Sequence, residues 1–97
     1  MNKDIRFTWS KNKAKKNLAK HDVSFDEAMT VFYDEEARLI DDPDHSGEEE
    51  RFIIMGLGIK LKLLIVCHCY RDNDAVIRII SARKANKSEV HFYGGFI

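Results

Sequence analysis

The sequence predicts an α+β fold in which two N-terminal helices and a short C-terminal helix pack on one face of an antiparallel β-sheet. Residues 11–35 carry two patterns of apolar spacing typical of helices, and from residue 51 onward the apolar residues recur in the alternation of strands. The chain has 97 residues, of which 44% are hydrophobic, with one proline and five glycines. This composition is typical of a folded protein, and we expect a single domain spanning residues 1–97.

The N-terminal segment is expected to form one strand and one basic helix. Residues 5–9 alternate between apolar and polar side chains, as in a short strand. Ser10 suits the N-cap of a helix over residues 11–21, which contains five lysines. The apolar stripe of this helix is narrow and comprises Ala14, Leu18 and His21. Such a helix is predicted to lie on the surface and to make a narrow contact.

A second helix is indicated by the S-x-x-E capping box of Ser24 and Glu27. Four apolar residues at helical spacing predict a face turned toward the core. They are Phe25, Ala28, Met29 and Phe32. This helix is expected to end near residues 33–35.

The rest of the chain predicts an antiparallel meander followed by a helix. Strands are expected at residues 37–40, 51–55, 60–70 and 76–84, and a short helix is expected at residues 85–93. Residues 41–50 are acidic and contain proline and glycine, so they are expected to form a loop. Turns are expected at residues 56–58 and 71–74, where Gly, Asp and Asn interrupt the apolar pattern.

Charge is strongly segregated along the chain. Residues 1–20 carry +6, residues 21–50 carry −11 and residues 51–97 carry +5, so the formal net charge is 0. A basic patch suits an anionic partner such as nucleic acid or an acidic protein. The alternative is that the basic and acidic segments are solvated faces that neutralise each other in the fold.

Other classes of protein are not expected from this composition. No apolar run approaches the roughly 20 residues of a membrane span. The N-terminus lacks the apolar stretch of a signal peptide, and two cysteines are too few for a disulfide framework. We therefore expect a soluble cytoplasmic protein.

The long strand expected at residues 60–70 presents two different faces. One face is wholly apolar and is expected to turn toward the core: Leu61, Leu63, Ile65, Cys67 and Cys69. The other face changes from apolar to polar: Lys62, Leu64, Val66, His68 and Tyr70. If the following turn spans residues 71–75, His68 pairs with Arg78 on this second face. In the same register Tyr70 pairs with Val76.

The second face is a candidate anion site, since it offers Lys62, His68, Tyr70 and Arg78, flanked by Arg71, Arg83 and Lys84. Arginine can donate two hydrogen bonds to phosphate oxygens at once, histidine can transfer a proton near neutral pH, and tyrosine can stack on a base. Arg83 joins Arg78 on one face only if the last strand contains a bulge or ends there. The alternative is that Arg78 pairs with an acid of residues 41–50 and that His68 is a half-buried hydrogen-bonding residue.

No metal site and no cofactor site are expected. Strand alternation places the thiols of Cys67 and Cys69 on one face and the imidazole of His68 on the other, so the three cannot chelate one ion together. Residues 41–45 lack the spacing of an EF-hand. The sequence also has no P-loop, no dinucleotide fingerprint and no H-E-x-x-H motif.

Four segments carry a resemblance to a known family. They are F-T-W-S-K-x-K-A-x-x-N-L-x-K-H-x-V-S-F-x-E-A at residues 7–28, D-P-D-H-S at residues 42–46, E-E-R at residues 49–51 and R-I-I-S-A-R-K-A at residues 78–85. Together they resemble the BrnT family, the toxins of type II toxin–antitoxin systems. The resemblance implies a RelE-like fold, metal-independent cleavage of RNA that inhibits translation, and neutralisation by a BrnA-type antitoxin. Operator DNA is expected to be contacted only indirectly, through the antitoxin.

The resemblance also implies which residues form the site. In a RelE-like ribonuclease the 2′-hydroxyl of the RNA attacks the neighbouring phosphate, and fixed cations stabilise the transition state. Arg78 and Arg83 are expected to hold that phosphate. His68 is expected to act as general acid or base, and Glu89 as an alternative base or as the orienting partner of an arginine. Further contacts to RNA are expected from Arg51, Lys62, Tyr70, Arg71 and Lys84.

Ser81 and Tyr93 match further recurrent positions of that family. The tail departs from it, because Val90, His91 and Phe92 follow Glu89 where relatives often carry Lys or Arg. A function of a different class also stays open. It is a non-catalytic binding module that partners a DNA-binding antitoxin in operon autoregulation and holds phosphate without cleaving RNA.

Overall fold

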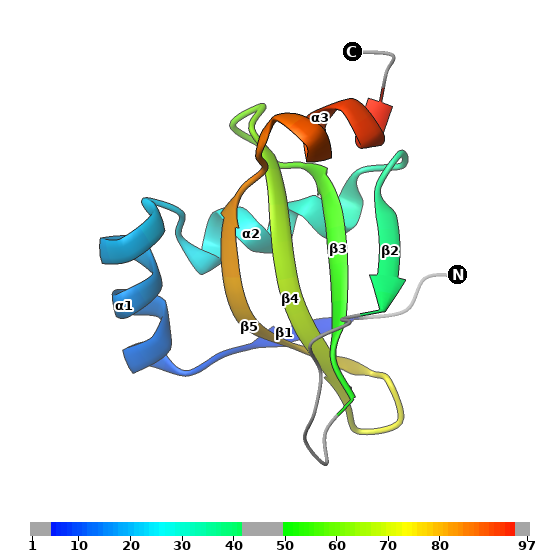
Figure 1. Ribbon diagram of the computed structural model, residues 1–97. Helices are drawn as coiled ribbons and strands as arrows, with labels where there is room; N and C mark the ends of the chain where they lie inside the picture. The colour runs from blue at the N-terminus through cyan, green and yellow to red at the C-terminus, as the bar shows by residue number, and fades with distance from the viewer. Residues whose placement is uncertain (1–4, 42–49, 95–97) are drawn as a thin grey trace.

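A computed structural model of the chain describes residues 5–41 and 50–94 (Figure 1). The elements follow in the order β1 (Arg6–Thr8), α1 (Lys11–His21), α2 (Phe25–Thr30), the 3₁₀ turn η1 (Val31–Tyr33), β2 (Arg38–Asp41), β3 (Phe52–Leu57), β4 (Leu63–Arg71), β5 (Val76–Lys84) and α3 (Lys87–Gly94). The acidic loop expected at residues 41–50 falls largely outside the described residues. Within them, no helix combines the length and the apolar composition that crossing a membrane requires.

The five strands form one mixed sheet in the order β1-β5-β4-β3-β2. The meander from β2 to β5 is antiparallel, as predicted, and β2 lies at one edge. The sequence did not reveal that β1 pairs with β5 in parallel, with Arg6 opposite Val76. An α+β fold is thereby confirmed.

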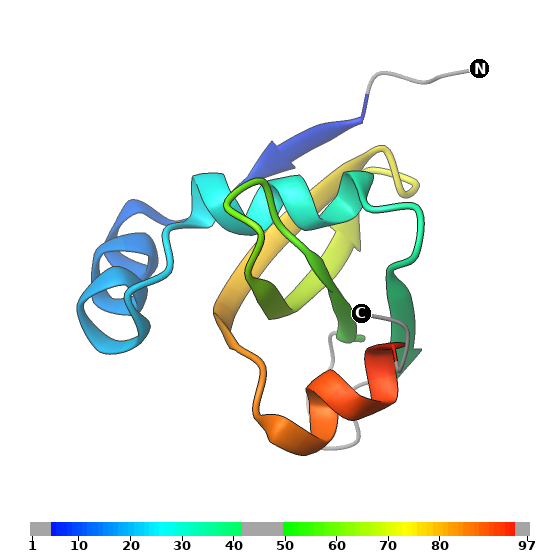
Figure 2. The same cartoon turned by 90° about the horizontal axis from the view of Figure 1, so that it is seen from above.

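Helices cover both faces of this sheet, rather than one (Figure 2). Residues of α2, with Val23 before it and Val31 after it, pack on β3, β4 and β5 in the main core. Tyr93 of α3 packs on Met55 and Ile65 in a smaller cluster on the opposite face. The expectation that the helices share one face is wrong, since α3 leaves β5 on the far side of the sheet from α2.

The two N-terminal helices begin where the sequence predicts. The hydroxyl oxygen of Ser10 accepts from the Lys13 N–H at 3.3 Å, and that of Ser24 accepts from the Glu27 N–H at 3.0 Å. Each bond satisfies an amide that the first turn of a helix leaves unpaired. The predicted bounds of α1 and the predicted end of the second helical segment are confirmed.

The assignment of the two faces of β4 is wrong in its main point. Ile65 and Cys69, on the face expected to be core, are buried, but the larger core lies on the other face. Leu64, Val66 and His68 are fully buried on the face that α2 covers. Ile65 and Cys67 point to the other face. Both faces of β4 begin with apolar residues, so alternation alone could not identify the one that lies against the larger helical core. Leu61 is not in the strand: it has φ 64° in the turn and is 77% exposed.

The turn between β3 and β4 lies later than its glycines suggest. Gly56 is still in β3, and the turn closes where the Leu61 N–H donates to the Gly58 carbonyl at 2.9 Å. Gly56 serves close packing, because a Cβ there would lie 2.9 Å from Cγ1 of Val31. The glycine therefore allows β3 to approach η1.

The register of β4 and β5 differs from the prediction by one residue and contains a bulge. Tyr70 lies opposite Ile77, Cys69 opposite Arg78 and His68 opposite Ile79. The predicted pairs of His68 with Arg78 and of Tyr70 with Val76 are wrong. The reason is the turn, in which Asp72, Asn73 and Asp74 all have positive φ, so that Arg71 already pairs with Val76.

Past the bulge, Cys67 lies opposite Ser81, so Ile80 is the extra residue of β5. Strict alternation would put Arg78 and Arg83 on opposite faces. The extra residue restores both to the same face, opposite Cys69 and Ile65 respectively. The bulge that the sequence left open is therefore present.

Helix α1 is attached to β5 by a buried amide rather than by its expected apolar stripe. Leu18 is 49% exposed, whereas Asn17 is 7% exposed. The Asn17 side chain donates to the carbonyls of Val23 and Ala82, both at 2.9 Å, and accepts from the Ala82 N–H at 3.1 Å. This contact fixes the helix against the strand that carries the arginines.

Replacing Asn17 by Ala is expected to lower the free energy of unfolding by about 3 kcal/mol, because it leaves the N–H and C=O of Ala82 buried and unpaired. Asn12, which lies exposed on the same helix, provides the control, and Asn12→Ala should change stability by less than about 0.5 kcal/mol. Urea unfolding followed by circular dichroism measures both. Equal stabilities of the two variants would contradict this role of Asn17.

Candidate nucleic-acid interface

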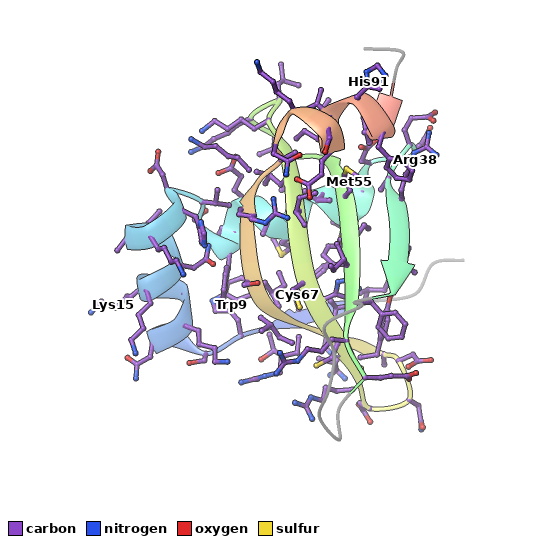
Figure 3. All side chains as sticks on the ribbon, viewed as in Figure 1. Trp9, Lys15, Arg38, Met55, Cys67 and His91 are labelled. Atoms are coloured by element: carbon purple, nitrogen blue, oxygen red, sulfur yellow. The ribbon has the colours of Figure 1, made fainter. Side chains whose placement is uncertain are left out.

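The face of the sheet that carries Arg78, Ser81 and Arg83 is called the open face here. Helix α3 covers one end of it and leaves the region around Cys67 uncovered (Figure 3). A pocket of about 300 Å³, the arginine pocket, lies in this region. Its lining comprises His21, Arg51, Ile53, Ile65, Cys67, Ile80, Ser81, Ala82 and Arg83. The pocket thus combines an apolar floor with cationic and polar side chains from three strands and from the end of α1.

Arg83 is held in place by a two-pronged contact with Glu89 of α3. Its Nη1 and Nη2 lie 2.9 and 2.8 Å from the two carboxylate oxygens, and Nη1 also donates to the Lys84 carbonyl at 3.2 Å. The hydrogen bond from Arg83 lowers the pKa of Glu89, and the same bond raises the pKa of Arg83. Both groups stay charged at neutral pH, so Arg83 is a fixed cation of the pocket.

Helix α3 is itself anchored to the rest of the fold, which fixes the position of Glu89. The buried Tyr93 hydroxyl donates to the Asp34 carboxylate, and Arg38 donates to the Tyr93 carbonyl at 3.0 Å. Burial and the bond to Asp34 raise the pKa of Tyr93 to about 12, so the hydroxyl keeps its proton. Tyr93 therefore has a structural role.

Arg51 and Arg78 supply further positive charge to the open face. Arg51 is exposed immediately before β3 and lines the arginine pocket, and Arg78 is partly buried opposite Cys69. Across residues 5–41 and 50–94, neither guanidinium has an ion pair with a carboxylate. Among the residues that the structure describes, the open face therefore carries more positive charge than carboxylates pair with. The alternative pairing of Arg78 with an acid of residues 41–50 falls largely outside the described residues.

His68 and Tyr70 lie on the other side of the sheet from these arginines. His68 is 0% exposed, and its ring packs edge-on against Phe32 with the centroids 4.8 Å apart. Its Nε2 lies 3.3 Å from the Tyr70 hydroxyl. Burial lowers the pKa of His68, so the imidazole is neutral. The structure does not bring His68 to the arginines, and the alternative of a hydrogen-bonding histidine describes its position better.

The remaining expected contact residues lie outside the arginine pocket. Lys62 precedes β4, and its carbonyl accepts from the Gly58 N–H. Lys84 lies at the end of β5, with its Nζ 4.0 Å from a carboxylate oxygen of Asp22. Arg71 is exposed at the far end of β4. The arginine pocket therefore brings together Arg51 and Arg83, and Glu89 is bound to Arg83. Arg78 lies on the same face of the sheet but does not line the pocket, so the expected pairing of Arg78 with Arg83 around one phosphate is not seen.

His21 is the residue that sequence reasoning missed. It appeared there only as part of an apolar stripe, whereas it lines the arginine pocket at the last residue of α1. Its position at the C-terminal end of a lysine-rich helix was the available signal, since a helix C-terminus favours a cationic side chain. Of the histidines that the structure describes, His21 is the one that lines this pocket.

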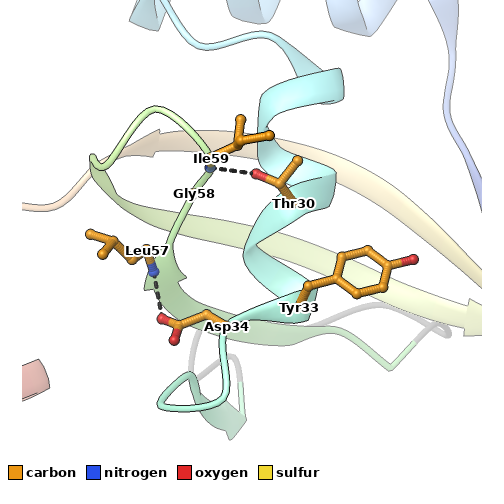
Figure 4. Close-up of a pocket in the computed structure, with 6 residues that line it drawn as sticks. All are labelled: Thr30, Tyr33, Asp34, Leu57, Gly58 and Ile59. Carbon is orange, nitrogen blue, oxygen red and sulfur yellow. Dashed lines mark hydrogen bonds between the residues drawn. The ribbon is translucent and has the colours of Figure 1, made fainter.

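A larger pocket of about 420 Å³ lies elsewhere, between η1 and the end of β3 (Figure 4). Its edges are tied by two bonds, from the Leu57 N–H to Asp34 at 2.7 Å and from the Ile59 N–H to Thr30 at 2.9 Å. It has an acidic side chain and no basic one. Charge, rather than volume, therefore selects the arginine pocket as the phosphate-binding candidate.

Among the described residues, no three His, Cys, Asp or Glu side chains come together as a metal ion requires. Cys67 is partly exposed and Cys69 is buried.

One sheet face of this small α+β protein carries an arginine that Glu89 holds in place and two further arginines without an ion pair among the described residues. This is the electrostatic character of a nucleic-acid-binding protein. The chain belongs to the BrnT family, the ribonuclease toxins of type II toxin–antitoxin systems, whose family model matches residues 9–89. This confirms the resemblance seen in the sequence.

The crystal structure of the Brucella abortus ribonuclease toxin BrnT is similar to this fold, with a TM-score of 0.65 and 19% sequence identity. The match covers 86% of this chain and 99% of that chain. No curated protein matches the sequence. The match supports the α+β architecture, and the RelE-like assignment stays a prediction.

The contact between Arg83 and Glu89 predicts a pH dependence of stability. The carboxyl pKa is lower in the folded than in the unfolded protein, so the contact stabilises the fold above the unfolded pKa of about 4.3 and is lost as the pH falls through the folded value. Glu89→Gln should cost less than about 1 kcal/mol at pH 7, because both side chains are partly exposed. That cost should disappear in acid.

Urea midpoints of the wild type and of Glu89→Gln, measured from neutral pH down to about pH 3, test this prediction. Glu35→Gln is the control, since Glu35 is exposed and has no such contact. A cost of Glu89→Gln that stays constant with pH would show that the carboxylate charge is not what stabilises the contact.

Proposed function

We propose that the protein is a metal-independent endoribonuclease that cleaves RNA, inhibits translation and is neutralised by a BrnA-type antitoxin. The observation that carries this proposal is the arrangement of Arg83, which Glu89 orients and which shares a pocket with Arg51 on the open face. A guanidinium held in advance of binding can stabilise charge that develops on a phosphate without further reorganisation.

The reaction that fits this site is an internal transfer of the phosphoryl group. The 2′-oxygen of a ribose forms a bond to the adjacent phosphorus, the bond to the 5′-oxygen of the next nucleotide breaks, and a proton moves from the attacking to the leaving oxygen. A cyclic phosphate and a free 5′-hydroxyl result. The added negative charge in the transition state falls on the non-bridging oxygens, which Arg83 and Arg51 would contact and Arg78 would screen.

His21 is the side chain that we assign to proton transfer. Histidine is a residue type that commonly transfers protons in catalysis, and His21 lines the same pocket as the arginines. Glu89 is less suited, because both of its carboxylate oxygens accept from Arg83 and its pKa is lowered. Glu89 then acts as the orienting partner, one of the two roles that the sequence left open for it.

Neutralisation by an antitoxin fits the charge of the open face. An acidic partner would cover the arginines, remove their unneutralised charge from solvent and block RNA at the same time. The same contact would serve the alternative function, a binding module for operon autoregulation, so partner binding alone does not separate the two. RNA cleavage by the isolated protein does.

Arg83→Ala is expected to reduce RNA cleavage by about 10²–10³-fold, the usual cost of losing one fixed donor to a transition-state charge. Cleavage of labelled RNA in the presence of a chelator measures the rate, and the wild type should remain active there. Arg6→Ala is the matched control, because Arg6 lies on β1, where it pairs with Asp72.

The same variants can be produced in a bacterium that lacks the antitoxin, and growth can be followed after induction. We expect the wild type and Arg6→Ala to arrest growth and Arg83→Ala to allow it. Unchanged cleavage by Arg83→Ala would remove this residue from the site. An absence of cleavage by the wild type, together with tight antitoxin binding, would favour the non-catalytic module.

His21→Gln is expected to lower the cleavage rate at neutral pH by about 10²-fold or more, the usual contribution of a positioned proton-transfer group. It should also alter the pH–rate profile, because the group that transfers the proton shapes that profile. His91→Gln is the control, since His91 is exposed on α3 and does not line the pocket. A rate and a pH–rate profile of His21→Gln that match those of the wild type would assign proton transfer to another group.

A further inference from the structure

A second pocket adjoins the arginine pocket and is lined mainly by helix α1. It measures about 230 Å³ and is lined by Lys13, Lys16, Asn17, Lys20, His21, Ile80 and Ser81. We call it the lysine trough. His21, Ile80 and Ser81 line both pockets. The two hollows therefore share a boundary at the β5 bulge and form one continuous depression from Arg51 to Lys13.

The lysines of this trough gather on one side of α1 because of their spacing. Positions 13, 16 and 20 project within about 60° of one another around a helix with 3.6 residues per turn. Asn17, bonded to Ala82, turns that side toward β5. The step from Lys13 to Lys20 is about 10 Å along the helix axis, long enough for more than one phosphate group.

The charge of the trough is not neutralised within the part of the chain that the structure describes. Helix α1 contains no acidic residue. No ion pair among the described residues involves Lys13, Lys16 or Lys20. Two other lysines, Lys11 and Lys15, lie on the opposite side of the helix, where Lys15 lines a separate hollow beside Trp9.

We propose that the lysine trough binds the backbone of single-stranded RNA on one side of the phosphate held in the arginine pocket. This inference rests on the proposed function and adds the path that the substrate takes. A positively charged groove that follows successive phosphates is the usual way of holding a single strand without reading its sequence. The bulge at Ile80 makes the path continuous, since it gives both pockets a shared floor.

The binding test uses an RNA oligonucleotide of about 10 nucleotides that carries 2′-O-methyl groups throughout. This probe keeps the phosphates and lacks the attacking hydroxyl, so it can be bound but not cleaved. The test variant is Lys16→Gln/Lys20→Gln. The matched control is Lys11→Gln/Lys15→Gln, which removes the same charge at the same four-residue spacing from the other side of α1.

The lysine-trough variant is expected to flatten the slope of log K against log salt by about 1.4, because each phosphate contact on a single strand contributes about 0.7. The control should keep the wild-type slope, and Lys16→Arg/Lys20→Arg should restore it. Equal losses in the two glutamine variants would overturn the inference, since they would reflect net charge alone. An unchanged slope in both variants would overturn it too.

Another outcome would assign the trough to a protein. If Lys16→Gln/Lys20→Gln weakens only the complex with the antitoxin and leaves RNA binding intact, the proposed RNA path is wrong. Failure of the proposed function looks different. In that case the wild type binds the 2′-O-methyl probe with the expected salt dependence and does not cleave the unmodified oligonucleotide of the same sequence.

Discussion

The single extra residue of β5 is the constraint on which the site depends. In an uninterrupted strand, residues five apart point to opposite faces of a sheet. Ile80 is bulged out of the ladder, and as a result Arg78 and Arg83 point to the same face. The same residue lines both basic pockets. The bulge thus places both arginines of β5 on one face of the sheet, and its extra residue lines the hollows beside α1.

Some basic side chains that the structure describes are paired with carboxylates, and others, on α1, are not. Glu89 holds Arg83 by two bonds while leaving the pocket open on its other sides. The lysines of α1, by contrast, form no ion pair with a carboxylate among the described residues. The balanced formal charge of the whole chain therefore hides a local excess of positive charge along one depression, where a polyanion is attracted most strongly.

Much of the fold could be predicted from local rules. Ser10 and Ser24 fixed the helix starts because capping is decided by neighbouring residues. The face assignment of β4 failed because Leu63, Leu64, Ile65 and Val66 are apolar on both sides of the strand. The site was predicted in part. Arg83 was already part of the anion site predicted from strand periodicity, and Glu89 was named from the family resemblance. His21 required knowledge of a contact between α1 and β5 that no local pattern contains.

The amide of Asn17 also has a consequence for association between copies of the chain. Strand β1 pairs only with residues 76–78 of β5, so the rest of that strand has no neighbour on this side among the described residues. Asn17 donates to the carbonyl of Ala82 and accepts from its N–H, as a peptide group of an adjacent strand would. Helix α1 therefore closes an edge that would otherwise offer a template for β-aggregation.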